Sequence, residues 1–362
     1  MAYTTIDDPT QHFEAITYTG NDSNNRNVTG LEFTPGFVWI KNRSTTDPHK
    51  MFDVARGANK SLKPNSTDTE VNTEENGYVS AFISGGFTLT DDNGSANLDD
   101  VNKNNEVYIA WCWKANGTST ASNNDGTNIT STVSANTTGG FAALTWTGTG
   151  TESDTVGHGL GAKTDAIWIK ERTGEDWWHS WQTGMGGDAY NNFFNNNNAI
   201  RTGVNDGHVK NLNNTTTFGF ESTTSNVNAV NHNSINNVAW VFAAKQGYSK
   251  MGNYRGNGST NGPFVYLGFK PAWVYIKRTD AAGDHVIMDN KKNPNNVMNI
   301  YTKIQATDAD NTDASFNIDK CATGFKCRHN NGNFNADGGD YLYMAFAEDP
   351  TVNSSGIPCN AG

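Results

Sequence analysis

The chain has 362 residues, of which 26 are Lys or Arg and 37 are Asp or Glu, so its formal net charge is −11. This acidity argues against a nucleic-acid partner, because affinity for phosphates comes mainly from cationic side chains. The sequence has no apolar run of about 18 residues, which a membrane span needs, and its first residues lack the basic and apolar regions of a signal peptide. We therefore expect synthesis in a cytosol and no membrane insertion.

The composition predicts an all-β protein. The chain contains nine Leu but ten Trp, and 37 of its residues are Gly. Abundant Asn, Gly and Thr disfavour helices, whereas β-branched and aromatic residues favour strands. Aromatic residues make up 11% of the chain, which argues against disorder.

The first strongly patterned stretch is residues 37–41, Phe-Val-Trp-Ile-Lys, a short apolar run typical of a strand buried on both faces. Residues 107–114 then alternate with the period of two that a strand shows. The same two segments recur twice, at 166–170 with 237–240 and at 273–277 with 343–346.

The spacing inside these repeats is nearly constant. From Trp39 to Trp111 and from Trp168 to Trp240 the step is 72 residues, and from Tyr275 to Phe346 it is 71. A thrice-repeated spacing of this kind indicates tandem modules. We predict three tandem antiparallel β-sandwich modules of jelly-roll type: module one (1–117), module two (139–246) and module three (247–362 with a C-terminal tail), with an Asn/Ser/Thr-rich linker at 118–138.

A polar pattern accompanies the repeats. Eight or nine residues after each repeated Lys comes a His, and in modules one and three an Asp follows four residues later; module two has Thr183 there. Side chains four residues apart along a strand lie about 13 Å apart, so a catalytic triad or a one-ion metal site is not expected. We interpret the set as structural polar groups, with a ligand site as the alternative: Lys41, His49, Asp53, Lys170, His179, Lys277, His285 and Asp289.

One aromatic cluster occurs in module two only. Trp177, Trp178 and Trp181 follow the acidic pair Glu175 and Asp176. Aromatic rings beside acidic groups are typical of sugar-binding sites, because the CH face of a sugar ring is apolar. The three Trp residues are therefore candidate glycan-binding residues, and core packing is the alternative.

No catalytic residue and no cofactor is predicted. A Walker loop, a dinucleotide fingerprint and a nucleophile elbow are all missing from the sequence. A glycan-cleaving enzyme would have Glu171, Glu175 or Asp176 as its acids.

Residues 91–94 and the acids at 308, 310 and 313 lack the spacing of an EF-hand loop, so solvated acidic turns are favoured over Ca²⁺ sites. Cys112 is expected to be a buried thiol. A Cys321–Cys327 disulfide stays open, with a reduced pair favoured by cytosolic synthesis.

Four strings resemble a repeat module of virion proteins of tailed bacteriophages, of the marine and cyanobacterial type. They are the stretch from Tyr-Thr-Gly-Asn to Trp-Ile-Lys-Asn-Arg at 18–43, His-Lys-Met-Phe-Asp-Val-Ala-Arg-Gly at 49–57, Val-Tyr-Ile-Ala-Trp-Cys-Trp-Lys-Ala at 107–115, and the end at 341–358. The resemblance implies a concanavalin A-like β-sandwich fold and carries no catalytic residues. Module two departs from it at Thr183 and in its Asn-rich stretch at 191–198.

This resemblance implies a non-enzymatic virion structural protein that is synthesised in the cytoplasm of the bacterial host. A tail fibre or other surface appendage that attaches to host-surface glycans is the first expectation. A capsid-decorating protein and a glycan-cleaving enzyme are the alternatives. The implied partners are a tail adaptor or the capsid, host surface polysaccharide and further copies of the chain, with a trimer as the favoured oligomer. Repeated β-modules would give an elongated object.

Overall fold

The computed structural model describes residues 3–73, 75–91, 98–186, 190–202, 207–222, 224 and 226–359. In these ranges the strands form six antiparallel sheets arranged in three pairs. Each pair is a β-sandwich, which confirms the all-β fold and the three sandwich modules. The only helical elements in the same ranges are the 3-10 turn η1 (Pro9–Gln11) and α1 (Asn228–Asn231), and neither could cross a membrane.

Module one pairs a six-stranded sheet with a three-stranded one. The large sheet has the order β1 (Phe13–Thr19), β9 (Val107–Trp113), β3 (Phe37–Asn42), β4 (Lys50–Asp53), β5 (Gly57–Leu62) and β6 (Val71–Asn72). The small sheet has the order β2 (Arg26–Thr29), β8 (Gly86–Thr90) and β7 (Tyr78–Ile83).

Module two extends the same plan by two strands. Its large sheet has the order β10 (Ala121–Asn123), β11 (Ser131–Asn136), β12 (Phe141–Thr147), β20 (Asn236–Phe242), β14 (Ala166–Glu171), β15 (His179–Gln182), β16 (Tyr190–Phe193) and β17 (Arg201–Thr202). Its small sheet has the order β13 (Thr155–Gly157), β19 (Thr217–Glu221) and β18 (His208–Lys210). The stretch 118–138 is therefore not a linker as expected, because β10 and β11 within it pair into this sheet.

Module three repeats the plan of module one. Its large sheet has the order β21 (Ser249–Arg255), β29 (Asp340–Pro350), β23 (Phe269–Arg278), β24 (His285–Asp289), β25 (Ile300–Lys303) and β26 (Asn311–Thr312). Its small sheet has the order β22 (Phe264–Tyr266), β28 (Gly324–Cys327) and β27 (Ile318–Cys321).

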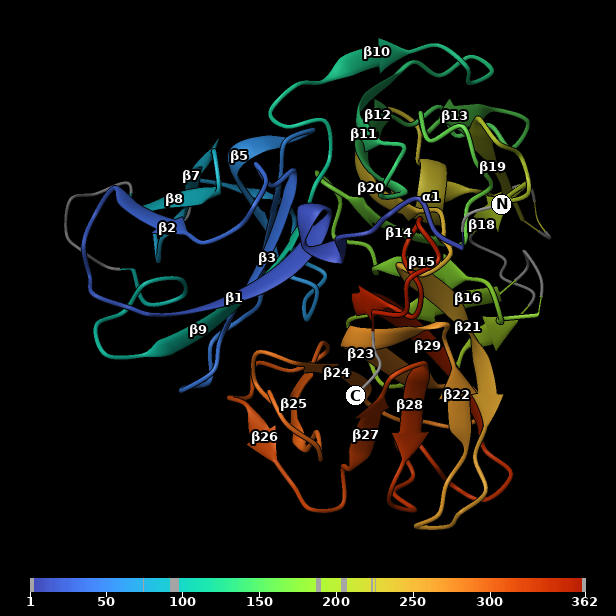
Figure 1. Cartoon of the computed structure of the whole chain (residues 1–362). Coiled ribbons are helices and arrows are strands. Elements are labelled where there is room, and N and C mark those ends of the chain that lie inside the picture. The colour runs from blue at the N-terminus through green and yellow to red at the C-terminus, as the bar shows by residue number, and fades with distance from the viewer. Residues whose placement is uncertain are drawn as a thin grey trace.

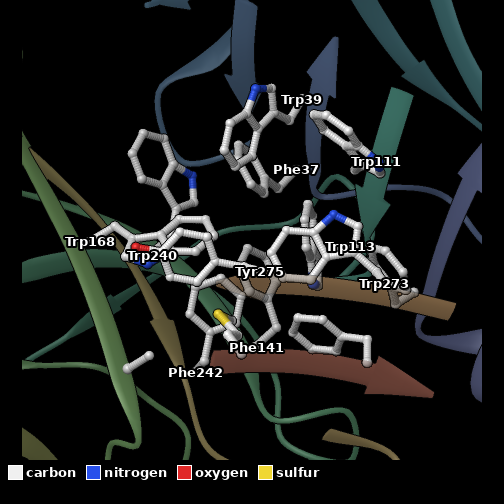
Figure 2. Packing of buried hydrophobic residues seen from close by; sticks show 14 of the residues in the cluster. Phe37, Trp39, Trp111, Trp113, Phe141, Trp168, Trp240, Phe242, Trp273 and Tyr275 are labelled. Atoms are coloured by element: carbon white, nitrogen blue, oxygen red, sulfur yellow. The ribbon is translucent and has the colours of Figure 1, made fainter. Parts of the chain in front are cut away.

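The three modules form three lobes around one centre rather than a row (Figure 1). Their large sheets meet there in a single buried cluster to which every module contributes aromatic rings, labelled in Figure 2. Trp113 of module one, for example, packs edge-to-face on Trp168 of module two and on Trp273 of module three, with ring centroids 6.5 and 5.9 Å apart. The expectation of an elongated object is therefore wrong for this chain.

The alternation along each large-sheet strand explains how one sheet serves two cores. On β9, Ile109 and Trp111 belong to the central cluster, whereas Tyr108 and Ala110 belong to the core inside the sandwich of module one. Both faces of the strand are apolar and buried, so its sequence is a nearly continuous apolar run. The repeated runs in the sequence thus mark strands between two cores.

The strand register corrects one step of the sequence repeat. Trp39 lies opposite Trp111 and Trp168 opposite Trp240, but Tyr275 lies opposite Met344. In module three the residue equivalent to Trp111 and Trp240 is therefore Met344, two positions before the Phe346 that the aromatic pattern suggests. Phe346 instead lies opposite Trp273.

Candidate functional site

The three repeated lysines are buried at equivalent places on their sheets. Lys41, Lys170 and Lys277 have no exposed surface, and their ammonium groups donate hydrogen bonds to backbone carbonyls of the following loops. Burial lowers the pKa of each of these lysines to about 8. Lys277 also donates to the carbonyls of Asn197 and Asn198 in module two, at 3.2 and 2.7 Å. The lysines therefore stabilise the backbone that follows their strands, and Lys277 also binds module three to module two.

The three histidines are not equivalent, contrary to the sequence repeat. His285 lies opposite Lys277, whereas His179 lies opposite Ile169. In module one, Lys50 lies opposite Ile40, so His179 matches Lys50 in position. Trp178 consequently takes the place in module two that a histidine takes in the other modules.

This shared position contacts the neighbouring module in all three modules; His285 of module three packs edge-to-face on Phe194 of module two, with ring centroids 5.6 Å apart. His49 accepts a hydrogen bond from the indole of Trp39 on Nδ1, and its Nε2 lies 3.0 Å from the carbonyl of Lys303 in module three. Trp178 donates from its indole nitrogen to the carbonyls of Lys63 and Ser66 in module one, at 3.0 and 2.9 Å. The His or Trp side chain therefore reaches from one module into the next.

An acidic residue occupies the equivalent strand position in only two of the three modules. Asp53 lies opposite Phe37 and Asp289 opposite Trp273, but the residue opposite Ala166 is Gln182, not Thr183. All three side chains are buried. Module two thus has an uncharged amide where the others have a carboxylate.

A chain of charged groups crosses from module one to module two. The guanidinium of Arg56 lies 2.5 Å from the carboxylate of Asp53 and 3.3 Å from that of Glu70. The same carboxylate of Glu70 accepts two hydrogen bonds of 2.9 Å from Arg172 of module two. Arg56 also lies over the ring of Trp240, 5.4 Å from its centroid, a favourable cation–π arrangement.

An equivalent chain crosses from module three to module one. Lys292 lies 3.4 Å from Asp289 and 3.6 Å from Asp310, and Asp310 lies 2.6 Å from Arg43 of module one. Lys292 lies over the ring of Trp111 at 5.4 Å from its centroid. The interface between modules one and two and the interface between modules three and one are therefore joined by the same kind of charged chain.

The third interface, between modules two and three, has the same backbone hydrogen bond as the other two but, among the described residues, no equivalent chain of charged side chains. Ile200 donates its amide to the carbonyl of Thr279 at 3.1 Å, as Glu70 does to Arg172 and as Asp310 does to Arg43. The backbones of the three interfaces thus match, which is the pattern of a head-to-tail ring that closes on itself.

At this interface the equivalent side chains are neutral. Gln182, Met185, Ile200 and Thr279 stand where the other interfaces have an acid, a cation, an acid and an arginine. Gln182 donates to the carbonyl of Tyr343 in module three at 2.9 Å.

A cavity of about 620 Å³ opens at this neutral interface. Three of the four residues that replace the charged chain line it, namely Met185, Ile200 and Thr279, and Arg255 and Asp340 of module three line it too.

The candidate glycan-binding tryptophans do not form one exposed surface. Trp178 is fully buried and stacks on Trp240 with ring centroids 5.5 Å apart, and Trp181 is 9% exposed in the core of module two. Only Trp177 is open to solvent, with 44% of its surface exposed. The aromatic platform expected from the sequence is therefore not formed, because alternate residues of β15 point into the two different cores.

The other groups singled out in the sequence are a candidate acid, the cysteines and the possible metal ligands. Glu171 is buried and lies 3.3 Å from His232, and burial, followed by the charge of Asp176, raises its pKa. All four cysteines are free, so Cys321 and Cys327 are not bridged. Among the described residues, which include 91 but not 92–94, no His, Cys, Asp and Glu side chains gather in a group of three or more that could hold a metal ion.

The interface residues Arg56, Glu70 and Arg172 were missed by reasoning from the sequence. A signal was present for one of them, because Lys292 follows Asp289 by the same three residues that separate Arg56 from Asp53. The partners of these groups come from another module, and nothing in a single repeat indicates them.

Comparison with known proteins gives a family but no function. The chain belongs to the family described as Domain of unknown function (DUF7483), whose model matches residues 8–350. No curated protein and no solved structure matches it.

Proposed function

We propose that this member of the family is a non-enzymatic structural protein of a bacteriophage virion, placed on the outer surface, where it attaches the particle to host glycans. The observation that carries the proposal is the resemblance of the repeated strings at 18–43, 49–57 and 107–115 to a repeat module of virion proteins of tailed bacteriophages. The fold is compatible with this role, because a virion component must stay folded outside the cell.

The joining of the modules supports a rigid surface component. One aromatic cluster is shared by all three modules, and two of their interfaces carry buried ion pairs. Such a body cannot open one module without exposing the central rings of the other two, which would cost about 25 cal/mol for each Å² of apolar surface. This arrangement favours a compact terminal or decorating domain over a fibre shaft.

Assembly with other virion proteins is part of the proposal. The head-to-tail contacts of the modules are used up within one chain, since each module contacts both others through them. A homotrimer would therefore have to use other surfaces, and a tail adaptor or the capsid is the proposed attachment point. Sedimentation of the purified chain at micromolar concentration measures this directly.

The experiment for the proposed function is to find the chain on the particle. Virions of a phage that encodes it are purified by density gradient, analysed by mass spectrometry, and labelled with an antibody to the chain for electron microscopy. We expect several copies per virion and labelling at the tail. Labelling over the whole capsid would replace attachment by decoration, and absence of the chain from purified virions would refute the proposal.

A further inference from the structure

We propose that the cavity between modules two and three binds a short stretch of an uncharged saccharide. This inference rests on the proposed attachment to glycans and gives that function a site. The cavity measures about 620 Å³, inside the range of roughly 300–1,000 Å³ that small-molecule sites occupy.

The position of the cavity is the first argument. Three interfaces share one backbone plan, and two of them are filled by an acid–cation–acid–arginine chain. At the third, Met185, Ile200 and Thr279 are shorter or neutral, and all three face the empty volume. A structural repeat needs the same filling at each interface, so the departure at one interface marks a place where another use has replaced the ion pairs.

The lining chemistry is the second argument. Met185, Ala199 and Ile200 of module two give one apolar wall, and Tyr254 of module three adds an aromatic residue. Asn253 and Thr279 add an amide and a hydroxyl group. Apolar walls with a few polar groups match a sugar ring, which has an apolar CH face and hydroxyl groups around its edge.

The balance of charge defines the ligand class. Arg255 and Asp340 lie opposite each other on neighbouring strands and both line the cavity. Asp280 also lines it, and its carboxylate is held by Arg278 at 2.9 and 3.1 Å. The lining therefore carries one cation, Arg255, and two carboxylates, and the carboxylate of Asp280 is already paired with Arg278, which lies outside the lining. With that pair included the charges sum to zero, so the cavity favours neither an anionic nor a cationic ligand. Carboxylates that accept and guanidinium groups that donate suit neutral hydroxyl groups.

The test rebuilds the missing arginine. Thr279→Arg places in module three the residue that modules one and two have at this position, Arg43 and Arg172, and its side chain should fill the cavity. Asn104→Arg is the matched control, since it adds the same charge on an exposed turn of module one. Binding is measured by saturation-transfer NMR and by an array of neutral and acidic oligosaccharides, with lactose, maltose and N,N′-diacetylchitobiose as soluble probes.

We expect the wild type and Asn104→Arg to bind at least one neutral saccharide, and Thr279→Arg to bind it at least tenfold more weakly. If Thr279→Arg fails to fold, Arg255→Ala gives the second measurement, with binding weakened severalfold at unchanged melting temperature, because Arg255 is exposed. The inference is overturned if the wild type binds no neutral saccharide, or if both cavity variants bind as well as the wild type.

These outcomes are separate from those of the virion experiment. If the chain lies on the virion but binds no saccharide, its proposed place on the particle stands and the cavity site is refuted. A chain that binds saccharide in the cavity but is absent from virions would do the opposite.

Discussion

The ion-pair chain between modules one and two gives a quantitative prediction. Asp53 and Arg56 are both fully buried, and the carboxylate of Asp53 accepts from the guanidinium at 2.5 Å and from the backbone amide of Arg56 at 3.0 Å. We expect Asp53→Gln to leave the guanidinium without its nearest counter-charge. Removing one member of a buried pair costs about 3–5 kcal/mol.

The structure places the expected cost near the lower end of that range. Arg56 still has the carboxylate of Glu70 at 3.3 Å and the carbonyl of Met51 at 2.8 Å. We therefore predict a loss of about 3 kcal/mol in the free energy of unfolding, measured by urea denaturation with tryptophan fluorescence. Because the central cluster joins the modules, one cooperative transition is expected.

The chain supplies its own control in the neutral interface. Gln182 and Met185 stand where module one has Asp53 and Arg56. The double variant Asp53→Gln/Arg56→Met copies this pair and leaves no unpaired buried charge, so its stability should lie within about 1 kcal/mol of the wild type. A cost under about 1 kcal/mol for Asp53→Gln would contradict this role of the ion pair. So would a double variant whose loss in the free energy of unfolding equals the sum of the losses of the two single variants.

Three further predictions concern buried groups. Burial lowers the pKa of Lys41 to about 8, so between pH 8 and about 10.4 the unfolded chain binds more protons at this site; the stability of the wild type relative to Lys41→Met should therefore rise with pH in this window, by up to about 1.4 kcal/mol per unit in urea titrations. Burial holds the pKa of His49 well below its usual value, so wild-type stability should fall as the pH drops below about 6.5, and His49→Gln should reduce this loss in the same titrations. Trp178→Ala should cost about 3–5 kcal/mol in urea unfolding, whereas Trp177→Ala should leave the midpoint unchanged because Trp177 is exposed.

The sequence allowed the strands and the repeat to be predicted because both follow from local patterns. Residues 37–41 and 107–114 carry apolar runs and alternation, and the structure has β3 and β9 there. Which residues of the three modules occupy equivalent positions was harder to predict from the sequence. Trp178 stands among Trp177, Trp181 and two acidic residues, a pattern typical of sugar binding. A register shift of one residue between the modules conceals its match to His49.

The closed ring could not be predicted from a single module. An apolar strand such as 107–113 predicts burial on both faces, but it does not say that the second face is covered by the other modules. The stretch 118–138 is rich in Asn, Ser and Thr and was expected to be a linker, yet backbone pairing of β11 with β12 builds it into the sheet. Contacts such as Glu70 with Arg172 are 102 positions apart, and no pattern in the chain indicates them.

Cryo-electron microscopy of virions that carry this chain can show whether the chain is one closed, three-lobed body on the virion surface. We predict density on the outside of the particle in which three β-sandwich lobes meet at a filled centre, without a gap between modules two and three along their shared backbone contact. Density in which three separate lobes follow one another in a rod would contradict the closed ring. An outer surface without this density would contradict the place on the virion.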